Sequence, residues 1–164
     1  MEIIFPKRKE IRLGNYDYST CGVYFITICT KQKKPLFWNN VGATCGRPEN
    51  EYQLSDCGII VKNEIALLSS VYESVRVDKY IVMPDHIHML VSIVPDEFGR
   101  PQVAPTISRV VQQFKGAITK KVGFSLWQKG YYDHIIREQR DYDEIWQYID
   151  ENPLRWVLKK DERT

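Results

Sequence analysis

Two of the three histidines of this chain stand in the sequence PDHIH, residues 84–88, between two apolar runs. These runs have the β-branched and aliphatic residues that are typical of strands. Because side chains alternate along a strand, His86 and His88 are expected on one face of a sheet, and Ile87 and Met89 on the other. Two adjacent imidazoles can supply two ligands of a metal site. The residues alone leave a second interpretation open, in which both are hydrogen-bonded structural histidines.

A second group of chemically capable residues stands near the C-terminus. Tyr148 and Asn152 are four residues apart, so on a helix they share one side. The amide oxygen of Asn152 could complete a His-His-Asn site for a divalent ion, and the phenol of Tyr148 could attack a metal-bound phosphate. Alternatively, Tyr148 packs at a boundary with its hydroxyl in water, and Asn152 ends a helix because Pro153 follows.

The elements that position these residues follow from hydrophobic periodicity and turn residues. Strands are predicted over 22–30, 75–82, 86–94 and 131–137. A helix is expected from a cap at Ser55 or Asp56 to about residue 70, another after a cap at Thr106, and a last one from Asp141 to near Asn152. On the first helix the residues expected to be buried are Ile60, Ile65, Leu67 and Leu68. On the second they are Ile107, Val110, Val111, Phe114, Ala117 and Ile118, and on the last they are Tyr142, Ile145, Trp146 and Ile149.

This order of elements predicts an α+β fold. It is the ferredoxin-like, split βαβ pattern, with an antiparallel sheet and two helices on one face. The last helix is then available for the other face, where His86 and His88 would stand. The chain of 164 residues is expected to form a single domain, with a basic arm over 1–20 and an irregular, variable excursion over 39–56.

Charge and cysteine content bear on which partners the protein binds and in which compartment it works. The net charge is only +2, so overall charge does not indicate nucleic-acid binding, but the basic residues are clustered at Lys7, Arg8, Lys9 and Arg12, at Lys31, Lys33 and Lys34, and at Lys115, Lys120 and Lys121. Such clusters could contact phosphates or could simply be solvated. The four cysteines form no CxxC pair, and we find no signal peptide or membrane-length apolar run, which indicates free thiols and a cytoplasmic protein.

An ordered set of motifs carries a family resemblance. The set consists of PDHIH at 84–88, the stretch from Trp127 through YYDHIIR at 131–137, and Tyr148-Ile149-x-x-Asn152-Pro153, preceded by Arg12-Leu13, YDY at 16–18 and YFIT at 24–27. It resembles the REP-associated tyrosine transposases, relatives of the single-tyrosine HUH transposases. The resemblance covers nearly the whole chain and is weakest over 39–56.

The resemblance implies an enzyme with a tyrosine nucleophile. His86 and His88 match the metal ligands of the family, Asn152 matches the polar third ligand, and Tyr148 matches the nucleophile. Members bind single-stranded DNA whose palindromic repeats fold as hairpins. They cleave beside the hairpin through a 5′-phosphotyrosine linkage, and they use Mg²⁺ or Mn²⁺.

Further expectations concern the DNA and the assembly. The basic arm with Tyr16 and Tyr18 suits backbone contact and base stacking, and Arg137 and Arg140 are further phosphate-contacting candidates. We expect Tyr148 to act within its own chain, in a monomer or a homodimer. His134 is expected to be structural or to contact DNA, and Asp85 either orients a ligand histidine or is only a turn residue. Two other functions stay open: a protein of the same ancestry that binds DNA or RNA hairpins without cutting them, and a metal phosphohydrolase that uses water.

Overall fold

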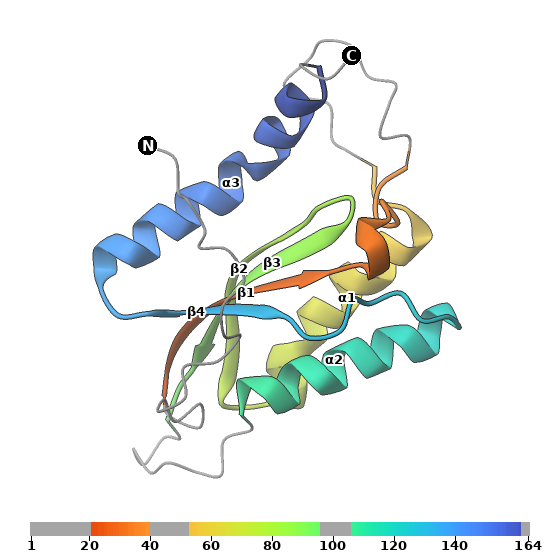
Figure 1. Ribbon diagram of the computed structural model, residues 1–164. Coiled ribbons are helices and arrows are strands. Elements are labelled where there is room, and N and C mark those ends of the chain that lie inside the picture. The colour runs from red at the N-terminus through yellow and green to blue at the C-terminus, as the bar shows by residue number, and fades with distance from the viewer. Residues whose placement is uncertain (1–20, 40–52, 96–105, 162–164) are drawn as a thin grey trace.

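The computed structural model describes residues 21–39, 53–95 and 106–161, which form one sheet and three α-helices (Figure 1). The arm predicted over 1–20 and residues 40–52 of the predicted excursion lie outside the described residues. The elements in chain order are β1 (Gly22–Cys29), the short 3₁₀ helix η1 (Lys31–Lys33), α1 (Asp56–Val71), β2 (Val75–Val82), β3 (His86–Ile93), α2 (Ile107–Val122), β4 (Tyr132–Ile136) and α3 (Gln139–Asp161).

The sheet has the predicted ferredoxin-like topology. Its strand order is β2-β3-β1-β4, and each neighbouring pair is antiparallel. Helices α1 and α2 cover one face, and α3 crosses the other (Figure 1). The α+β fold with an additional C-terminal helix is therefore confirmed. No helix of the described residues is long and apolar enough to span a membrane.

The main core lies between the sheet and the α1–α2 layer. Ile87, Met89, Val91 and Ile93 alternate into it from β3, as the strand pattern predicts. In α1 the prediction was partly wrong, because Leu67 is 46% exposed and the buried residues are Gly58, Val61, Ile65 and Leu68. Gly58 explains this rotation of the helix: a Cβ atom there would lie 2.2 Å from the Phe37 carbonyl oxygen, so this side approaches the backbone most closely.

Both helices of this layer begin at side-chain caps. Ser55, one of the two predicted candidates, accepts a hydrogen bond from the Gly58 amide, and Thr106 accepts one from the Arg109 amide. The predicted apolar face of α2 is buried except for Ala117, which is half-buried. At the end of α2, Gly123 takes the left-handed conformation with φ 82°.

A second, smaller cluster fastens α3 to the open face of the sheet. Phe25 and Leu90 from the two central strands meet Ile145 and Ile149 from the helix. Tyr142 and Trp146, predicted to be buried with them, are half-buried. Nearer the edge, Lys79 of β2 pairs with Asp150 at 2.5 Å and lies over the Trp146 ring, 4.6 Å from its centroid.

The predicted end of the last helix near Asn152 was wrong. α3 continues through Pro153 to Asp161. A proline removes one intrahelical donor and only disfavours helix in the residue before it, so contacts beyond it can carry the helix on. Here Trp156, one turn after Asn152, packs against the main core cluster and supplies such contacts. The extension adds two turns of helix beside the histidines.

Candidate active site

The sheet half of the site comes from the pairing of β1 with β3. His86 is opposite Cys29, and His88 is opposite Thr27. The imidazoles project from the face that carries α3, as the strand alternation predicts. Their Nε2 atoms lie 3.1 Å apart, with 4.6 Å between the ring centroids and 71° between the ring planes. Two ring nitrogens that converge in this way can occupy adjacent positions around one metal ion.

His88 is buried and held by two residues of β1. Its ring is 5% exposed, it stacks on Phe25 with 5.2 Å between centroids, and its Nδ1 atom lies 2.8 Å from the Thr27 hydroxyl. Burial, and secondarily the neighbouring His86, lowers the pKa of His88 well below 6.5. The imidazole is therefore neutral at pH 7, which is the form that binds metals.

His86 is oriented by the residue before it. The carboxylate of Asp85 lies 2.5 Å from His86 Nδ1, and Asp85 is itself buried. The Asp85 carbonyl accepts two hydrogen bonds from Thr30, one from the amide at 2.9 Å and one from the side-chain hydroxyl at 3.0 Å. A carboxylate on Nδ1 leaves Nε2 free to coordinate, so of the two roles open for Asp85 the structure supports the histidine-orienting one.

The helix half of the site is one face of α3. Tyr148, Asn152 and Trp156 follow one another at one-turn spacing. The Tyr148 ring lies 5.5 Å from the His88 ring, and the Trp156 ring lies 6.0 Å from the His86 ring, centroid to centroid. Asn152 lies between them along the helix and is 8% exposed. One chain thus brings the predicted nucleophile and both predicted histidine ligands together.

The donor set fits a divalent ion only if Asn152 contributes. No group of three or more His, Cys, Asp or Glu side chains in the described residues could hold a metal. The Asn152 Nδ2 atom, however, is buried without a hydrogen-bond partner among them. Turning the amide by 180° places an oxygen, a suitable ligand atom, where the unpaired nitrogen now lies. Two imidazoles and one amide oxygen suit Mg²⁺ or Mn²⁺ whose remaining ligands are water or phosphate oxygens.

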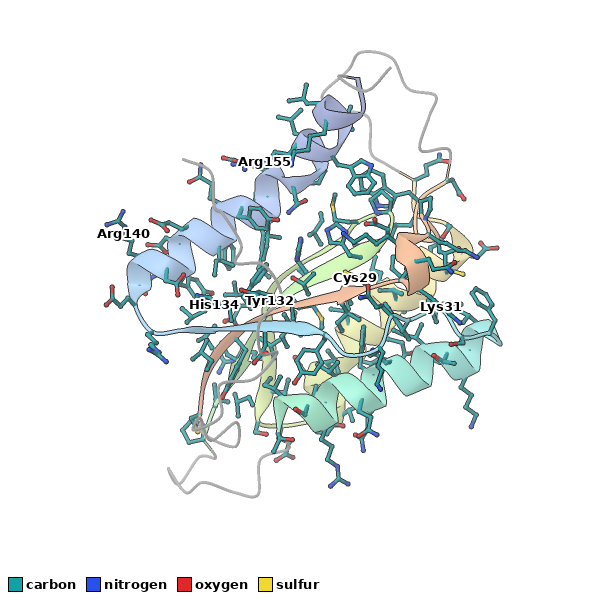
Figure 2. The ribbon with its side chains drawn as sticks, in the orientation of Figure 1. Cys29, Lys31, Tyr132, His134, Arg140 and Arg155 are labelled. Carbon is teal, nitrogen blue, oxygen red and sulfur yellow. The ribbon has the colours of Figure 1, made fainter. Side chains whose placement is uncertain are left out.

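Lysines surround the end of the sheet at which His86 stands. η1 follows β1 there, and it carries the exposed Lys31 and Lys33 (Lys31 is labelled in Figure 2). Gln32 and Lys33 have positive φ values of 57° and 52°, a conformation that non-glycine residues seldom adopt. Neither lysine pairs with a carboxylate of a described residue. Both are exposed and follow the end of β1 that pairs with His86.

The two predicted arginines do not reach this site. Arg137 follows Ile136, which pairs with Val23, whereas His86 pairs with Cys29 six residues further along β1. That separation is about 20 Å at 3.3 Å per residue. Arg140 lies in the first turn of α3, near Arg137 and distant from His86 (Figure 2). Its guanidinium pairs with Glu144 at 2.9 Å. The remaining DNA-binding candidates, Lys7, Arg8, Lys9, Arg12, Tyr16 and Tyr18, lie outside the described residues.

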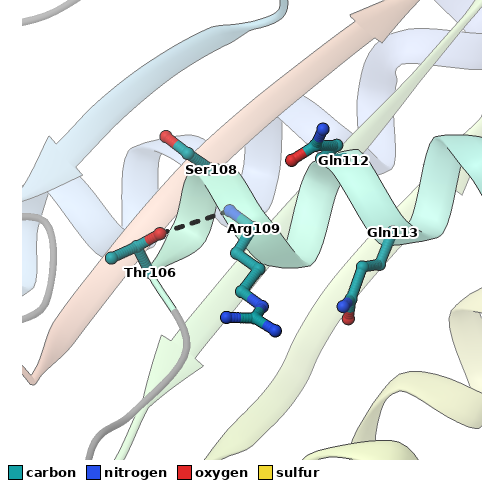
Figure 3. A pocket seen from close by; sticks show the side chains of 5 residues that line it. All are labelled: Thr106, Ser108, Arg109, Gln112 and Gln113. Atoms are coloured by element: carbon teal, nitrogen blue, oxygen red, sulfur yellow. Dashed lines mark hydrogen bonds between the residues drawn. The ribbon is translucent and has the colours of Figure 1, made fainter.

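His134 fastens the end of the sheet to α3. Its Nε2 atom lies 2.8 Å from the Asp141 carboxylate, across the link between β4 and the helix (His134 is labelled in Figure 2). This contact agrees with the structural alternative that the sequence left open. A separate hollow on α2 is lined by Thr106, Ser108, Arg109, Gln112 and Gln113 (Figure 3). It belongs to the helix layer on the other face of the sheet, so it is no part of the histidine site.

Three residues of the site were not predicted from the sequence. Thr27 contacts His88, Trp156 contacts His86, and Arg155 lies over the Tyr148 ring with its guanidinium carbon 5.9 Å from the centroid. The helical spacing after Asn152 would have revealed the last two if the helix had been carried past Pro153. The role of Thr27 depends on strand register, which the sequence does not contain.

Comparison with known proteins gives one relative by sequence. An uncharacterised protein of Haemophilus influenzae is 33% identical in an alignment that covers 91% of this chain and 89% of that protein. The chain belongs to the family of this protein. No protein-family model matches the sequence.

Solved structures extend the comparison to the fold. The structure of a REP-associated tyrosine transposase bound to a REP hairpin matches with a TM-score of 0.59 and 18% identity, over 93% of this chain and 74% of that one. A proposed transposase of Deinococcus radiodurans matches with a TM-score of 0.49 and 17% identity, over 85% and 95% of the two chains. The first match shows that this chain has the fold of that REP-associated tyrosine transposase.

Proposed function

We propose that the protein is a REP-associated tyrosine transposase that cleaves single-stranded DNA beside palindromic hairpin repeats and transfers the strand. The observation that carries this proposal is the position of Tyr148 against His88, whose Nε2 atom converges with that of His86. A pair of potential metal ligands beside a phenol suits metal-assisted attack of that phenol on a phosphate. The structural neighbour that binds a REP hairpin supports this class of substrate.

In the proposed reaction the Tyr148 oxygen attacks the phosphorus of a phosphodiester. The bond from phosphorus to the 3′-oxygen breaks, the phenol proton leaves to solvent, and the 3′-oxygen takes up a proton. The products are a 5′-phosphotyrosine and a free 3′-hydroxyl, and attack by another 3′-hydroxyl reverses the step and joins strands. Mg²⁺ or Mn²⁺ bound by His86, His88 and Asn152 would polarise the phosphate and stabilise the leaving oxygen.

The protein's own residues prepare this step. Thr27 and Asp85 contact the Nδ1 atoms of the two imidazoles, which leaves both Nε2 atoms for a metal ion. Phe25 contacts His88 and also Tyr148, whose ring centroid is 6.2 Å away, and so fixes the spacing between ligand and nucleophile. Because a single chain supplies both halves, we expect Tyr148 to act within its own chain, whether the protein is a monomer or a homodimer.

The test uses an end-labelled hairpin oligonucleotide with a single-stranded flank, incubated with the protein and Mn²⁺ and separated by denaturing electrophoresis. We expect a covalent protein–DNA adduct from the wild type and none from Tyr148→Phe. Tyr142→Phe is the matched control, because Tyr142 lies on the same helix and its hydroxyl points to Asp78 at 3.3 Å, away from the histidines. The control should form the adduct as the wild type does.

Two other outcomes would replace the proposal. Cleavage that survives Tyr148→Phe would identify water as the nucleophile and the protein as a phosphohydrolase. Binding of the hairpin without cleavage in Mg²⁺ or Mn²⁺ would identify a hairpin-binding protein that does not cut.

A further inference from the structure

Trp156 is the residue of the site whose chemistry the proposed cleavage does not use. Its indole lies against the His86 ring, 6.0 Å between centroids, on the helix face that also carries Tyr148 and Asn152. The indole nitrogen Nε1 is buried and has no hydrogen-bond partner among the described residues. A buried donor without an acceptor destabilises the folded chain.

Two other tryptophans show that the fold pairs buried indoles elsewhere. Trp38 donates to the Val82 carbonyl at 2.7 Å, and Trp127 donates to the Lys115 carbonyl at 3.1 Å. Of these three buried indoles, only that of Trp156 lacks an acceptor among the described residues. Unlike the amide of Asn152, an indole has no alternative orientation that turns its donor into an acceptor. The partner that it lacks must be an acceptor from outside the described residues.

We infer that Trp156 is a phosphate-binding residue whose Nε1–H donates to a non-bridging oxygen of the DNA backbone at the histidine site. This inference rests on the proposed function and adds an interaction to it. A phosphate held between the histidines and α3 presents anionic oxygens to the face that Trp156 shares with Tyr148. Charge-assisted hydrogen bonds to such oxygens are stronger than bonds between neutral groups. Because Nε1 is covered in the DNA-free chain, binding requires the groups that cover it to move.

The first test measures cleavage of the hairpin oligonucleotide by Trp156→Phe. Phenylalanine keeps an aromatic ring against His86 and removes only the donor. We expect the rate of adduct formation at saturating DNA to fall about 10- to 100-fold, the range for loss of one hydrogen bond to a charged group. Trp146→Phe is the matched control, because Trp146 lies on the same helix but packs on Tyr142 and Lys79. Its rate should equal that of the wild type.

The second test observes the indole N–H directly by ¹⁵N–¹H NMR. The peak of Trp156 is the one that disappears in Trp156→Phe. Adding the hairpin oligonucleotide with Mg²⁺ should move this peak downfield and leave the peaks of Trp38 and Trp127 in place. A Trp156 peak that does not move would overturn the inference, even if Trp156→Phe slows cleavage.

The two tests separate failure of this inference from failure of the proposed function. If the wild type forms no adduct, the proposed cleavage is wrong, and the NMR peak still decides whether Trp156 contacts a phosphate. If the adduct forms and the peak moves while Trp156→Phe cleaves at the wild-type rate, the interaction is supported as a binding interaction only. If the peak stays in place, Trp156 is a packing residue.

Discussion

The imidazole of His88 and the phenol of Tyr148 lie 5.5 Å apart, centroid to centroid, with 62° between the ring planes. The first residue is in the centre of the sheet and the second is on the helix that crosses it. Phe25 contacts both rings, so the small cluster that fastens the helix also sets the separation of the proposed ligand and nucleophile. Packing and chemistry therefore depend on the same side chains.

The first prediction concerns Thr27, whose hydroxyl lies 2.8 Å from His88 Nδ1. Thr27→Val keeps the shape of the side chain and removes the hydroxyl, so nothing at this position fixes the orientation of the His88 ring. We expect the affinity for Mn²⁺ to fall about 10- to 100-fold, as for other residues that orient a metal ligand. Isothermal titration of EDTA-treated protein measures this. Thr27→Ser should restore the affinity, and equal affinities of Thr27→Val and wild type would disprove the role.

The second prediction is a loss of stability in mild acid for the metal-free protein. Burial lowers the pKa of His88 in the folded chain, whereas the unfolded chain has a pKa near 6.5. Stability from the neutral imidazole is thus complete above pH 6.5 and is lost as the pH falls, because the unfolded state takes up the proton. Between pH 7.5 and 5.5 the free energy of unfolding should fall by up to about 1.4 kcal/mol from this group.

Urea unfolding in EDTA at the two pH values checks this expectation. His88→Gln has no imidazole to protonate at this position, so it should lose less stability than the wild type over the same interval. An equal loss in both proteins would show that other groups cause the pH dependence.

The third prediction concerns the lysines of η1. Lys31→Ala/Lys33→Ala removes two exposed charges beside the His86 end of the sheet. For each phosphate that is no longer neutralised, the slope of log affinity against log salt should fall by about 0.7 for single-stranded DNA. Fluorescence anisotropy between 50 and 200 mM NaCl, roughly the range in which such interactions dominate, measures the slope. Lys62→Ala/Lys120→Ala removes equal charge from α1 and α2 on the opposite face and should leave the slope unchanged.

The fourth prediction concerns Pro153 inside α3. Pro153→Ala restores an amide donor within the helix, so the free energy of unfolding should rise by about 1 to 3 kcal/mol. Urea unfolding followed by circular dichroism measures the change. Leu154→Ala is the control, since this neighbouring side chain is exposed and its removal should change stability little. No gain in Pro153→Ala would mean that the backbone around Ile149 is satisfied in another way.

Much of the fold could be predicted because its signals are local. The alternation around His86 and His88 gave their common face correctly, and the cap at Thr106 gave the start of α2. The errors arose where an interaction distant in sequence decided the outcome. The approach of Gly58 to the Phe37 carbonyl rotated α1 away from the predicted face, and packing of Trp156 carried α3 through Pro153.

In the site, too, local features could be predicted and contacts between residues distant in sequence could not. Tyr148 and Asn152 could be placed on one side of a helix because their spacing is local. The contacts of Thr27 with His88 and of Trp156 with His86 depend on strand register and on how the helix lies, which periodicity does not determine. Arg137 and Arg140 were chosen for their charge and their place in a motif, and neither property reports the distance along β1 that separates them from His86.

The link between β4 and α3 is only the two residues between Ile136 and Gln139. Because this link is short, it holds the start of α3 close to the end of β4, and a tilt of the helix would pivot about this point. Trp156 is about 26 Å from the start of α3 and Ile145 about 9 Å, at 1.5 Å per residue. Any tilt about this link therefore displaces Trp156, at about 26 Å, farther than Ile149 at about 15 Å and Ile145 at about 9 Å, so the gap between helix and sheet widens most at the His86 end. A DNA strand would enter at that end.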